Sequence, residues 1–259
     1  LMIRPPPRSP LSPSSAASDV YKRQPKYVEL FCDNRILNIN GMIDFMVRDN
    51  SPFTDEGKNL LIEEFGKNYA TYFSILSAIA NGKNTQAEIE AALGNKSIGG
   101  YLRRLIEDYN IIVRQRPILS KEGTLAIRYE IQDNFISFWF NYFDKNRSLI
   151  EIKNYMALRS IIKADYPTYS GKMLERYFKQ KFAESFLYKD IGSWWELKGD
   201  AYEIDIVALC LEKDKAVAVE IKRQKKNYKP DLLEKKVEHL KHKVCLLYTS
   251  PSPRDYAAS

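Results

Sequence analysis

Two acidic residues and a lysine interrupt a pair of apolar runs late in the chain. In the stretch EIDIVALCLEKDKAVAVEIK (residues 203–222), Asp205 lies in the first run, and Glu220 and Lys222 lie in the second. The runs are rich in Val, Ile, Leu and Ala, and the charged segment LEKDK between them is typical of a hairpin loop. Because alternate side chains of a strand share a face, a hairpin would bring the three charged groups onto one patch of an otherwise apolar sheet.

Paired carboxylates of this kind are suited to a divalent ion. Mg²⁺ prefers oxygen ligands, is usually held by one or two carboxylates and retains water. Asp205 and Glu220 are therefore the candidate metal ligands, with the backbone carbonyl of Ile221 as a further oxygen. Such an ion would polarise a phosphoryl oxygen and help to ionise a bound water, while Lys222 could orient that water or offset charge on the phosphorus. The expected cofactor is Mg²⁺ or Mn²⁺.

A helix expected before the hairpin supplies a further carboxylate. In SGKMLERYFKQKFAESFL (residues 170–187), apolar residues recur at every fourth position, which predicts an amphipathic helix. Glu175 lies beside this apolar stripe, so its side chain can reach the edge of the sheet on which the helix packs. It could hold a metal-bound water or a second ion, and Glu175 and Lys222 are therefore the candidate catalytic residues. The stripe consists of Leu174, Phe178, Phe182 and Phe186.

The same charged residues also have a purely structural explanation. Lys222 could pair with Glu220 or Asp205 in a salt-bridged surface hairpin that binds no metal. The strand context on both sides, the separation of 15 residues between the two acids and the preceding helix with its own acid favour the site. In addition, two neighbouring carboxylates repel each other, and a metal would relieve that repulsion.

Residues 69–134 have the order of elements of a winged helix-turn-helix. Their pattern predicts three helices, over 69–82, 85–94 and 97–112, the second of which opens with a Thr–Glu capping box. Two strand-like segments, VRQRPIL and LAIRYEI, then form the wing. In such a module the third helix enters the major groove of DNA and the wing touches the phosphate backbone.

Basic side chains mark the surfaces that could contact DNA phosphates. Acids are interspersed among those of the winged helix, and Gly99 and Gly100 present no side chain to bases, so a module used only for packing and linking is the alternative. The later run KRQKKNYK (residues 222–229) has five basic residues and no acid, although a solvated helix start is the simpler explanation of this run taken alone. The candidate DNA-contacting residues are Arg103, Arg104, Arg114, Arg116, Lys121, Arg128, Arg223, Lys225 and Lys226.

An aromatic segment, FISFWFNYF (residues 135–143), follows the winged helix. Proteins that bind single-stranded nucleic acid stack bases on such rings. The helical spacing of these rings and the absence of interleaved basic residues instead favour packing in a core or between domains.

The composition excludes several classes of function. The chain has 259 residues, 44% of them hydrophobic, and no apolar run near the roughly 18 residues that a membrane helix needs. Its three cysteines are scattered without metal-site or disulfide spacing, which fits a reducing compartment. Both histidines stand near the end, so a Ser–His or Cys–His catalytic pair is poorly supported. The expected location is the cytoplasm, and no membrane partner is expected.

Both ends of the chain are expected to be non-native. Residues 1–24 and 246–259 are rich in Pro and Ser and have no core-forming period. One short DNA can encode CLLYTS (residues 245–250) on one strand and, in a shifted frame, DVYKRQ (residues 19–24) on the other, as expected of adapter sequence read through at both ends. Residues 1–24 carry three of the seven net positive charges, so the remaining body is only mildly basic at +4.

The body resembles known families. GKMLERYF, EIDIVAL and AVAVEIK resemble the PD-(D/E)XK nuclease superfamily. PKYVELF, YFSILSAIANG, IGGYLRRL and NRSLIE resemble the C-terminal half of a prokaryotic AAA-type (P-loop) ATPase family that has a winged helix and a nuclease-like domain of unknown function. The resemblance covers residues 25–244 and matches Asp205, Glu220 and Lys222 to the nuclease motif and Glu175 to its usual helix acid.

The resemblance departs from the ATPase family in one respect. This chain has no G-x-x-x-x-G-K-[ST] motif, whose backbone amides and lysine cradle phosphates. ATP is therefore expected to bind only in a missing N-terminal domain, and this chain by itself should not hydrolyse it.

Together these features predict an α/β chain (α+β overall). Residues 25–68 are expected to be the helical remnant of an ATPase lid, 69–134 a winged helix and 135–169 a helical connector. Residues 170–245 are expected to form a truncated PD-(D/E)XK nuclease-like domain, whose restriction-endonuclease-like mixed sheet is flanked by helices.

The predicted function is that of a DNA-associated module with a metal-dependent nuclease-like site, within a fragment of an AAA-type ATP-binding protein. The alternative is a non-catalytic interaction or regulatory region of the ATPase with a degenerate nuclease fold. DNA is the partner expected in the first case. A protein partner, or self-association through the parent ATPase, is expected in the second.

Overall fold

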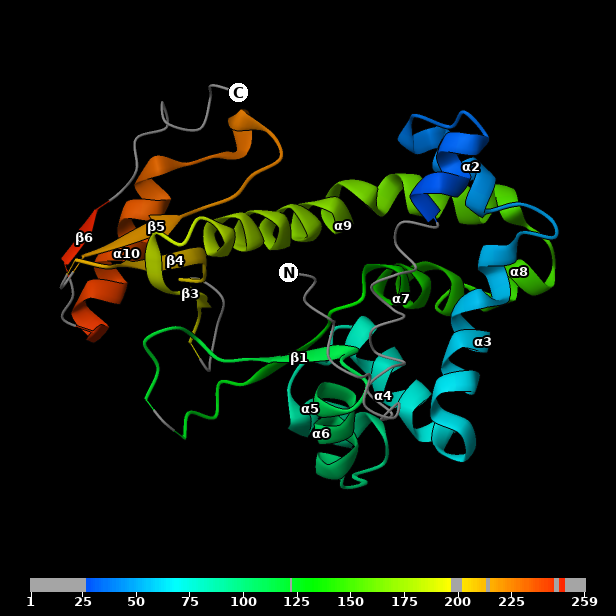
Figure 1. Cartoon of the computed structure of the whole chain (residues 1–259), viewed down its shortest axis with the longest axis horizontal. Coiled ribbons are helices and arrows are strands. Elements are labelled where there is room, and N and C mark those ends of the chain that lie inside the picture. The colour runs from blue at the N-terminus through cyan, green and yellow to red at the C-terminus, as the bar shows by residue number, and fades with distance from the viewer. Residues whose placement is uncertain (1–26, 122, 197–201, 213–214, 245–246, 250–259) are drawn as a thin grey trace, which may run out of the picture. The chain divides into compact units, whose positions relative to one another are not determined.

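The computed structural model describes residues 27–121, 123–196, 202–212, 215–244 and 247–249. The chain divides into two compact units, one formed by Leu1–Arg114 and Tyr129–Ile162 and the other by Gln115–Arg128 and Lys163–Ser259. Helices predominate in the first unit, and a small sheet flanked by helices forms the second (Figure 1). The fold is therefore α+β, as the sequence predicts.

The first unit begins with helices that have clear local start signals. Ser51 caps helix α3 (Pro52–Phe65), because its hydroxyl accepts from the backbone N–H of Phe53, and Pro52 occupies the first helical position. Gly57 of the same helix is buried against Trp139, and a Cβ at this position would collide with the indole ring. The other early helical elements are residues 27–33, α2 (Ile39–Met46) and η1 (Gly66–Asn68).

The helices predicted for the winged helix-turn-helix are present. The expected capping box is formed, since the Thr85 hydroxyl accepts from the Glu88 amide at 3.3 Å and Glu88 Oε2 accepts from the Thr85 amide at 3.0 Å. The expected apolar face of the first helix is buried, including Tyr72 and Ile75. Both wing strands are shorter than predicted. These elements are α4 (Tyr69–Ala80), α5 (Gln86–Ala92), α6 (Gly99–Glu107), β1 (Ile112–Gln115) and β2 (Arg128–Ile131).

The aromatic segment packs inside the first unit. Phe140 lies with its ring centroid 5.0 Å from that of Phe73, and the Trp139 indole N–H donates to the carbonyl oxygen of Thr54 at 2.9 Å. Trp139, Phe140, Tyr142 and Phe143 are all buried, so these rings form core, and packing rather than base stacking explains them. The segment is built from α7 (Asn134–Trp139) and a π-helical turn, η2 (Phe140–Asp144), followed by α8 (Arg147–Glu151).

A four-stranded mixed sheet organises the second unit. Its strand order is β3-β4-β5-β6, with the first three strands antiparallel and β6 parallel to β5. The hairpin predicted from the opening stretch is present as β4 and β5, and Val207 pairs with Ala218. The elements are α9 (Tyr155–Glu184), which continues from the first unit, β3 (Tyr188–Trp194), β4 (Ile204–Cys210), β5 (Lys215–Val219), η3 (Lys225–Asn227), α10 (Pro230–Val244) and β6 (Leu247–Thr249).

Helices cover both faces of this sheet (Figure 1). One face packs on the apolar stripe of α10, and the other packs on Leu174, Phe178 and Phe182 of α9. The first cluster contains Trp194, Ile204, Val207, Ala216, Ala218, Leu233, Val237 and Leu240, and the second contains Phe182, Ile206, Ala208 and Ile221.

One residue of the acidic strand lies on the face opposite to the one expected from alternation. Regular alternation groups Ile204 with Ile206 and Ala208, but Ile204 packs in the α10 cluster with Val207. The ladder between β3 and β4 shifts register between Gly192 and Trp194, opposite this position. Such an irregularity turns the strand locally, which explains the change of face.

The loop between the two wing strands is part of the second unit. The backbone N–H of Ile118 donates to the carbonyl oxygen of Ser193 at 2.9 Å, and the Ile118 side chain is buried in the α10 cluster. Gly192 lies directly beneath it, where a Cβ would come within 2.9 Å of Ile118. The Trp195 indole N–H donates to the carbonyl oxygen of Ala126 at 3.1 Å. The loop therefore covers the β3 edge of the sheet and completes its core.

Two local expectations differ from the structure. Phe186 does not extend the apolar stripe of α9, because the helix ends at Glu184 and Phe186 is 86% exposed with φ of 56°. Strand β3 follows directly and has no counterpart in the sequence prediction, since its residues are largely polar.

Part of the predicted non-native C-terminal segment is described. Residues 247–249 form β6, and the rest of 246–259, like the whole of 1–24, lies outside the described residues. Within the described ranges, every helix is too short or too polar to cross a membrane.

Candidate functional site

The charged residues of the β4–β5 hairpin converge at one point. The Lys222 ammonium lies 2.8 Å from Glu220 Oε1 and 3.6 Å from Asp205 Oδ2. Asp205 and Glu220 have side chains only 12% and 9% exposed, whereas Lys222 is 34% exposed. Burial lowers the pKa of Lys222, but its hydrogen bond to Glu220 and the charges of the nearby carboxylates raise that pKa overall. The sheet thus presents two buried carboxylates with one more accessible ammonium.

Asp205 is held rigidly at this point. Its Oδ2 accepts from the backbone N–H of Ile221 at 2.7 Å, and its backbone carbonyl accepts from the Ser193 hydroxyl at 2.6 Å. Burial raises the pKa of the Asp205 carboxyl, the Ile221 hydrogen bond lowers it, and the charge of Glu220 raises it further, with a net upward shift. Asp205 is therefore positioned by β3 and by the segment that follows β5.

Ser193 joins this carboxylate strand to helix α9. Its hydroxyl donates to Asp205 and also accepts from the Lys179 ammonium at 2.8 Å. Because the β3–β4 register shifts beside Ser193, its hydroxyl supplies a bond to β4 where the regular ladder is interrupted.

Ser193→Ala should lower the free energy of unfolding by about 1 kcal/mol, because it removes this donor and leaves the Asp205 carbonyl without it. Urea unfolding of the purified chain measures the loss. Ser185→Ala is the comparison, since the Ser185 hydroxyl makes only local bonds at the end of α9: it donates to the carbonyl of Phe182 and accepts from the backbone N–H of Leu187. Equal stability of the two variants would show that Ser193 has no structural role at the site.

Lys236 is a member of the cluster that the sequence reasoning missed. Its ammonium lies 3.0 Å from both Oε1 and Oε2 of Glu220, and the residue is only 8% exposed. A signal was available, because Lys236 stands between Leu233, Val237 and Leu240 on the side of α10 that faces the sheet.

Glu175 faces the cluster from α9. Burial, and to a lesser extent the negative charge of Asp205, raises the pKa of the Glu175 carboxyl to about 7. Lys222 and Lys179 oppose this shift, and Glu203 adds to it. At neutral pH, Glu175 is therefore divided between its neutral and ionised forms.

The donor set fits a hard divalent ion that retains much of its water. Asp205 and Glu220 offer only oxygen ligands, and two carboxylates are a usual set for Mg²⁺. In the part of the chain that the structure describes, no group of three or more His, Cys, Asp or Glu side chains could hold a metal ion. Two ammonium groups, those of Lys222 and Lys236, already balance the two carboxylates.

The predicted DNA-contacting residues divide between the two units. Arg128 is engaged within the second unit, because its guanidinium lies 2.9 Å from Glu203 Oε1 and 4.7 Å from the centre of the Trp195 ring. The Arg223 guanidinium lies 5.5 Å from the centre of the Tyr166 ring. The exposed candidates are Arg103, Arg104 and Arg114 in the first unit and Arg116, Lys121, Arg223, Lys225 and Lys226 in the second.

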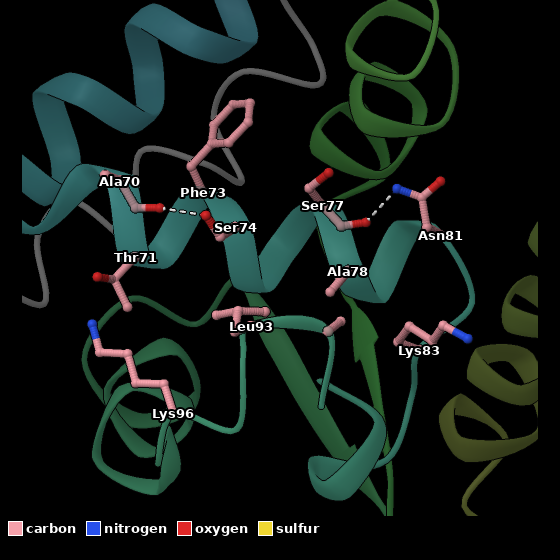
Figure 2. Close-up of a pocket in the computed structure, with 11 residues that line it drawn as sticks. Ala70, Thr71, Phe73, Ser74, Ser77, Ala78, Asn81, Lys83, Leu93 and Lys96 are labelled. Carbon is pink, nitrogen blue, oxygen red and sulfur yellow. Dashed lines mark hydrogen bonds between the residues drawn. The ribbon is translucent and has the colours of Figure 1, made fainter. Parts of the chain in front are cut away.

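A separate pocket of about 660 Å³ lies in the first unit. Figure 2 shows α4 as one wall, with Ser74, Ser77 and Asn81 along it, and Leu93 and Lys96 on the other side. The Ser74 hydroxyl donates to the carbonyl of Ala70, and the Asn81 amide donates to that of Ser77 (Figure 2), so these polar groups serve the helix itself.

The sequence comparisons find similarity over the segment that carries the cluster. Residues 139–239, which include all five clustered residues, match the profile of DUF234, described as archaea bacterial proteins of unknown function. The chain is also similar to the uncharacterized protein MJECL04 of Methanocaldococcus jannaschii, with 40% identity over 161 residues. That match covers 59% of this chain and 35% of the archaeal protein, so it spans about a third of the relative. No solved structure matched the chain.

Proposed function

We propose that the second unit is a divalent-metal-dependent phosphodiesterase that acts on DNA. The observation that carries this proposal is the contact of one ammonium, that of Lys222, with the carboxylates of both Asp205 and Glu220. Residues 15 positions apart in the sequence thus meet at one point, as hydrolysis of a phosphodiester would require.

Each residue of the cluster has a chemical role in this proposal. Asp205 and Glu220 would hold Mg²⁺ or Mn²⁺, which would polarise the phosphoryl oxygen and lower the pKa of a bound water. The Lys222 ammonium is suited to offset the negative charge that develops on the phosphoryl group. Glu175, with a pKa of about 7, can accept or release a proton at neutral pH.

The surroundings of the site support an anionic polymer as substrate. Arg223, Lys225 and Lys226 are exposed and follow Lys222 directly in the chain. Ammonium and guanidinium groups neutralise phosphates without reading sequence, so we expect binding that weakens as salt rises. The winged helix-turn-helix would add further DNA contacts through Arg103, Arg104 and Arg114.

We also propose that this chain corresponds to a part of a longer AAA-type ATPase. The archaeal relative is supporting evidence, because the matched segment is about a third of its length. In this proposal ATP binds elsewhere in the parent protein.

Asp205→Asn provides the test of the phosphodiesterase. Wild-type chain should cleave labelled duplex or single-stranded DNA with Mg²⁺ or Mn²⁺ and not with a chelator, and the variant should not cleave. Asp190→Asn is the matched control, since Asp190 is exposed on β3 and likewise accepts from a backbone amide, that of Ile191 at 2.9 Å. Cleavage that persists in Asp205→Asn, or that needs no divalent ion, would contradict the proposal.

A non-catalytic interaction region is the second candidate. The observation that favours it is the balance of charge, because Lys222 and Lys236 already satisfy the oxygens of Glu220. A non-catalytic region of this kind should bind neither divalent ions nor, in a salt-dependent manner, DNA. Calorimetry tests both, and either signal would count against this candidate.

A further inference from the structure

The ammonium of Lys236 lies against the carboxylate oxygens of Glu220, to which a metal ion would bind. Its Nζ lies 3.0 Å from each carboxylate oxygen of Glu220, and Lys222 also contacts Oε1. Glu220 Oε1 therefore accepts from two ammonium groups and Oε2 from one. Since a carboxylate has about four lone-pair positions, a divalent ion that binds both oxygens of Glu220 must displace an ammonium.

We infer that Lys236 is an internal counter-ion that competes with the divalent ion for Glu220 and so sets the affinity of the site for metal. This inference rests on the proposed function, because it concerns the same carboxylates. Lys236 acts here as a positioning residue: it holds the Glu220 carboxylate toward α10 when no ion is bound, and it yields at least one oxygen when an ion binds.

The burial of Lys236 argues against a merely incidental surface pair. The side chain of Lys236 is 10% exposed and that of Glu220 is 9% exposed. The neighbours of Lys236 on α10, Leu233 and Val237, are apolar and pack on the sheet. A buried ion pair is often no more stabilising than apolar residues of similar volume, so stability alone does not require a lysine here.

The two lysines of the cluster differ in their freedom to respond. The Lys222 side chain contacts both carboxylates. Because it is 34% exposed, it can also reach a phosphate group that approaches from solvent. Lys236 contacts only Glu220 among the clustered acids and is enclosed by α10 and the sheet. Competition with a metal is therefore assigned to Lys236, and contact with substrate to Lys222.

Lys236→Gln is expected to bind Mn²⁺ about tenfold more tightly than wild type or better, because it removes a positive charge next to the ion while keeping a hydrogen-bond donor for Glu220. Titration calorimetry with MnCl₂ measures the affinity. Without metal the variant should melt at a lower temperature than wild type, and Mn²⁺ should raise its Tm more than that of wild type. Lys235→Gln is the matched control, since Lys235 is the exposed neighbour on α10, and it should behave as wild type.

Unchanged or weaker Mn²⁺ binding by Lys236→Gln would overturn the inference. If that variant does not fold without metal, the double variant Glu220→Gln/Lys236→Gln decides the question by its thermal unfolding. It should be folded and more stable than Lys236→Gln alone, because the unbalanced carboxylate is gone, and a double variant no more stable than the single would also overturn the inference. Failure of the phosphodiesterase proposal would give a different result. The wild type would not cleave DNA, while Lys236→Gln would still bind Mn²⁺ more tightly than the wild type.

Discussion

Lys222→Met is expected to lower the rate of DNA cleavage about 100- to 1,000-fold, the usual cost of removing one group that stabilises transition-state charge. The ammonium of Lys222 is the accessible positive charge next to Asp205 and Glu220, at 3.6 and 2.8 Å. Methionine retains the length of the side chain but cannot compensate charge on a phosphoryl group. Single-turnover cleavage of labelled DNA at saturating Mg²⁺ measures the loss.

Two comparisons separate this effect from loss of metal or fold. Lys222→Met leaves Asp205, Glu220 and Lys236 in place, so Mn²⁺ affinity should not fall, and a slow reaction then reports on chemistry. Lys215→Met is the control on β5, where Lys215 is exposed and pairs with Glu212 outside the cluster. A Lys222→Met enzyme that cleaves as fast as Lys215→Met would remove Lys222 from the reaction.

Glu175→Gln is expected to stabilise the protein at alkaline pH and not at acidic pH. The folded protein holds the pKa of Glu175 near 7, above the ordinary 4.5, chiefly through burial. Below the unfolded pKa both states are protonated and no penalty exists. As pH rises through the window from 4.5 to about 7, the unfolded state releases its proton first, so the wild type loses stability relative to its acidic form.

The size of this effect follows from the shift. The difference between the ordinary pKa of 4.5 and the folded pKa of about 7 lowers the free energy of unfolding of the wild type by up to about 3 kcal/mol above pH 7. The glutamine variant has no ionisable group here and avoids this loss. Urea unfolding at a series of pH values should therefore show a difference that grows through this window and then levels off. Glu184→Gln, on the exposed end of the same helix, is the control, because its carboxyl has a lowered pKa through Lys181. A constant difference across pH for Glu175→Gln would contradict the shift.

The raised pKa of Glu175 also bears on the chemistry of the site. A carboxyl that changes charge near neutral pH is suited to proton transfer. If Glu175→Gln gains stability and loses cleavage, the two results together would identify a residue selected for activity.

Local patterns in the sequence predicted much of the fold. Apolar alternation on both sides of LEKDK predicted the β4–β5 hairpin, and the structure pairs Val207 with Ala218 in it. Capping chemistry predicted the start of α5 at Thr85. These features depend on neighbours in the chain, so a single sequence is enough to find them.

The missed features depend on long-range contacts. Strand β3 is polar because it lies at the edge of the sheet, and its pairing is fixed by β4 and not by its own pattern. The change of face at Ile204 follows from an extra residue in β4, where three steps from Ile204 to Val207 oppose two steps in β3, and the apolar pattern of β4 alone does not show which residues pair. The position of Lys236 in the apolar stripe of α10 could be seen in the sequence, but its contact with Glu220, 16 residues earlier, could not.

The loop between β1 and β2 has a practical consequence for dissecting this protein. Ile118 and Ala126 lie ahead of the first unit's last helices in the chain, yet both contact the sheet that carries Asp205. The second unit is therefore discontinuous along the polypeptide, and no single cut can release it whole. A truncated clone that starts within α9 would leave Trp194 and Trp195 uncovered, and its insolubility would say nothing about the chemistry of the site.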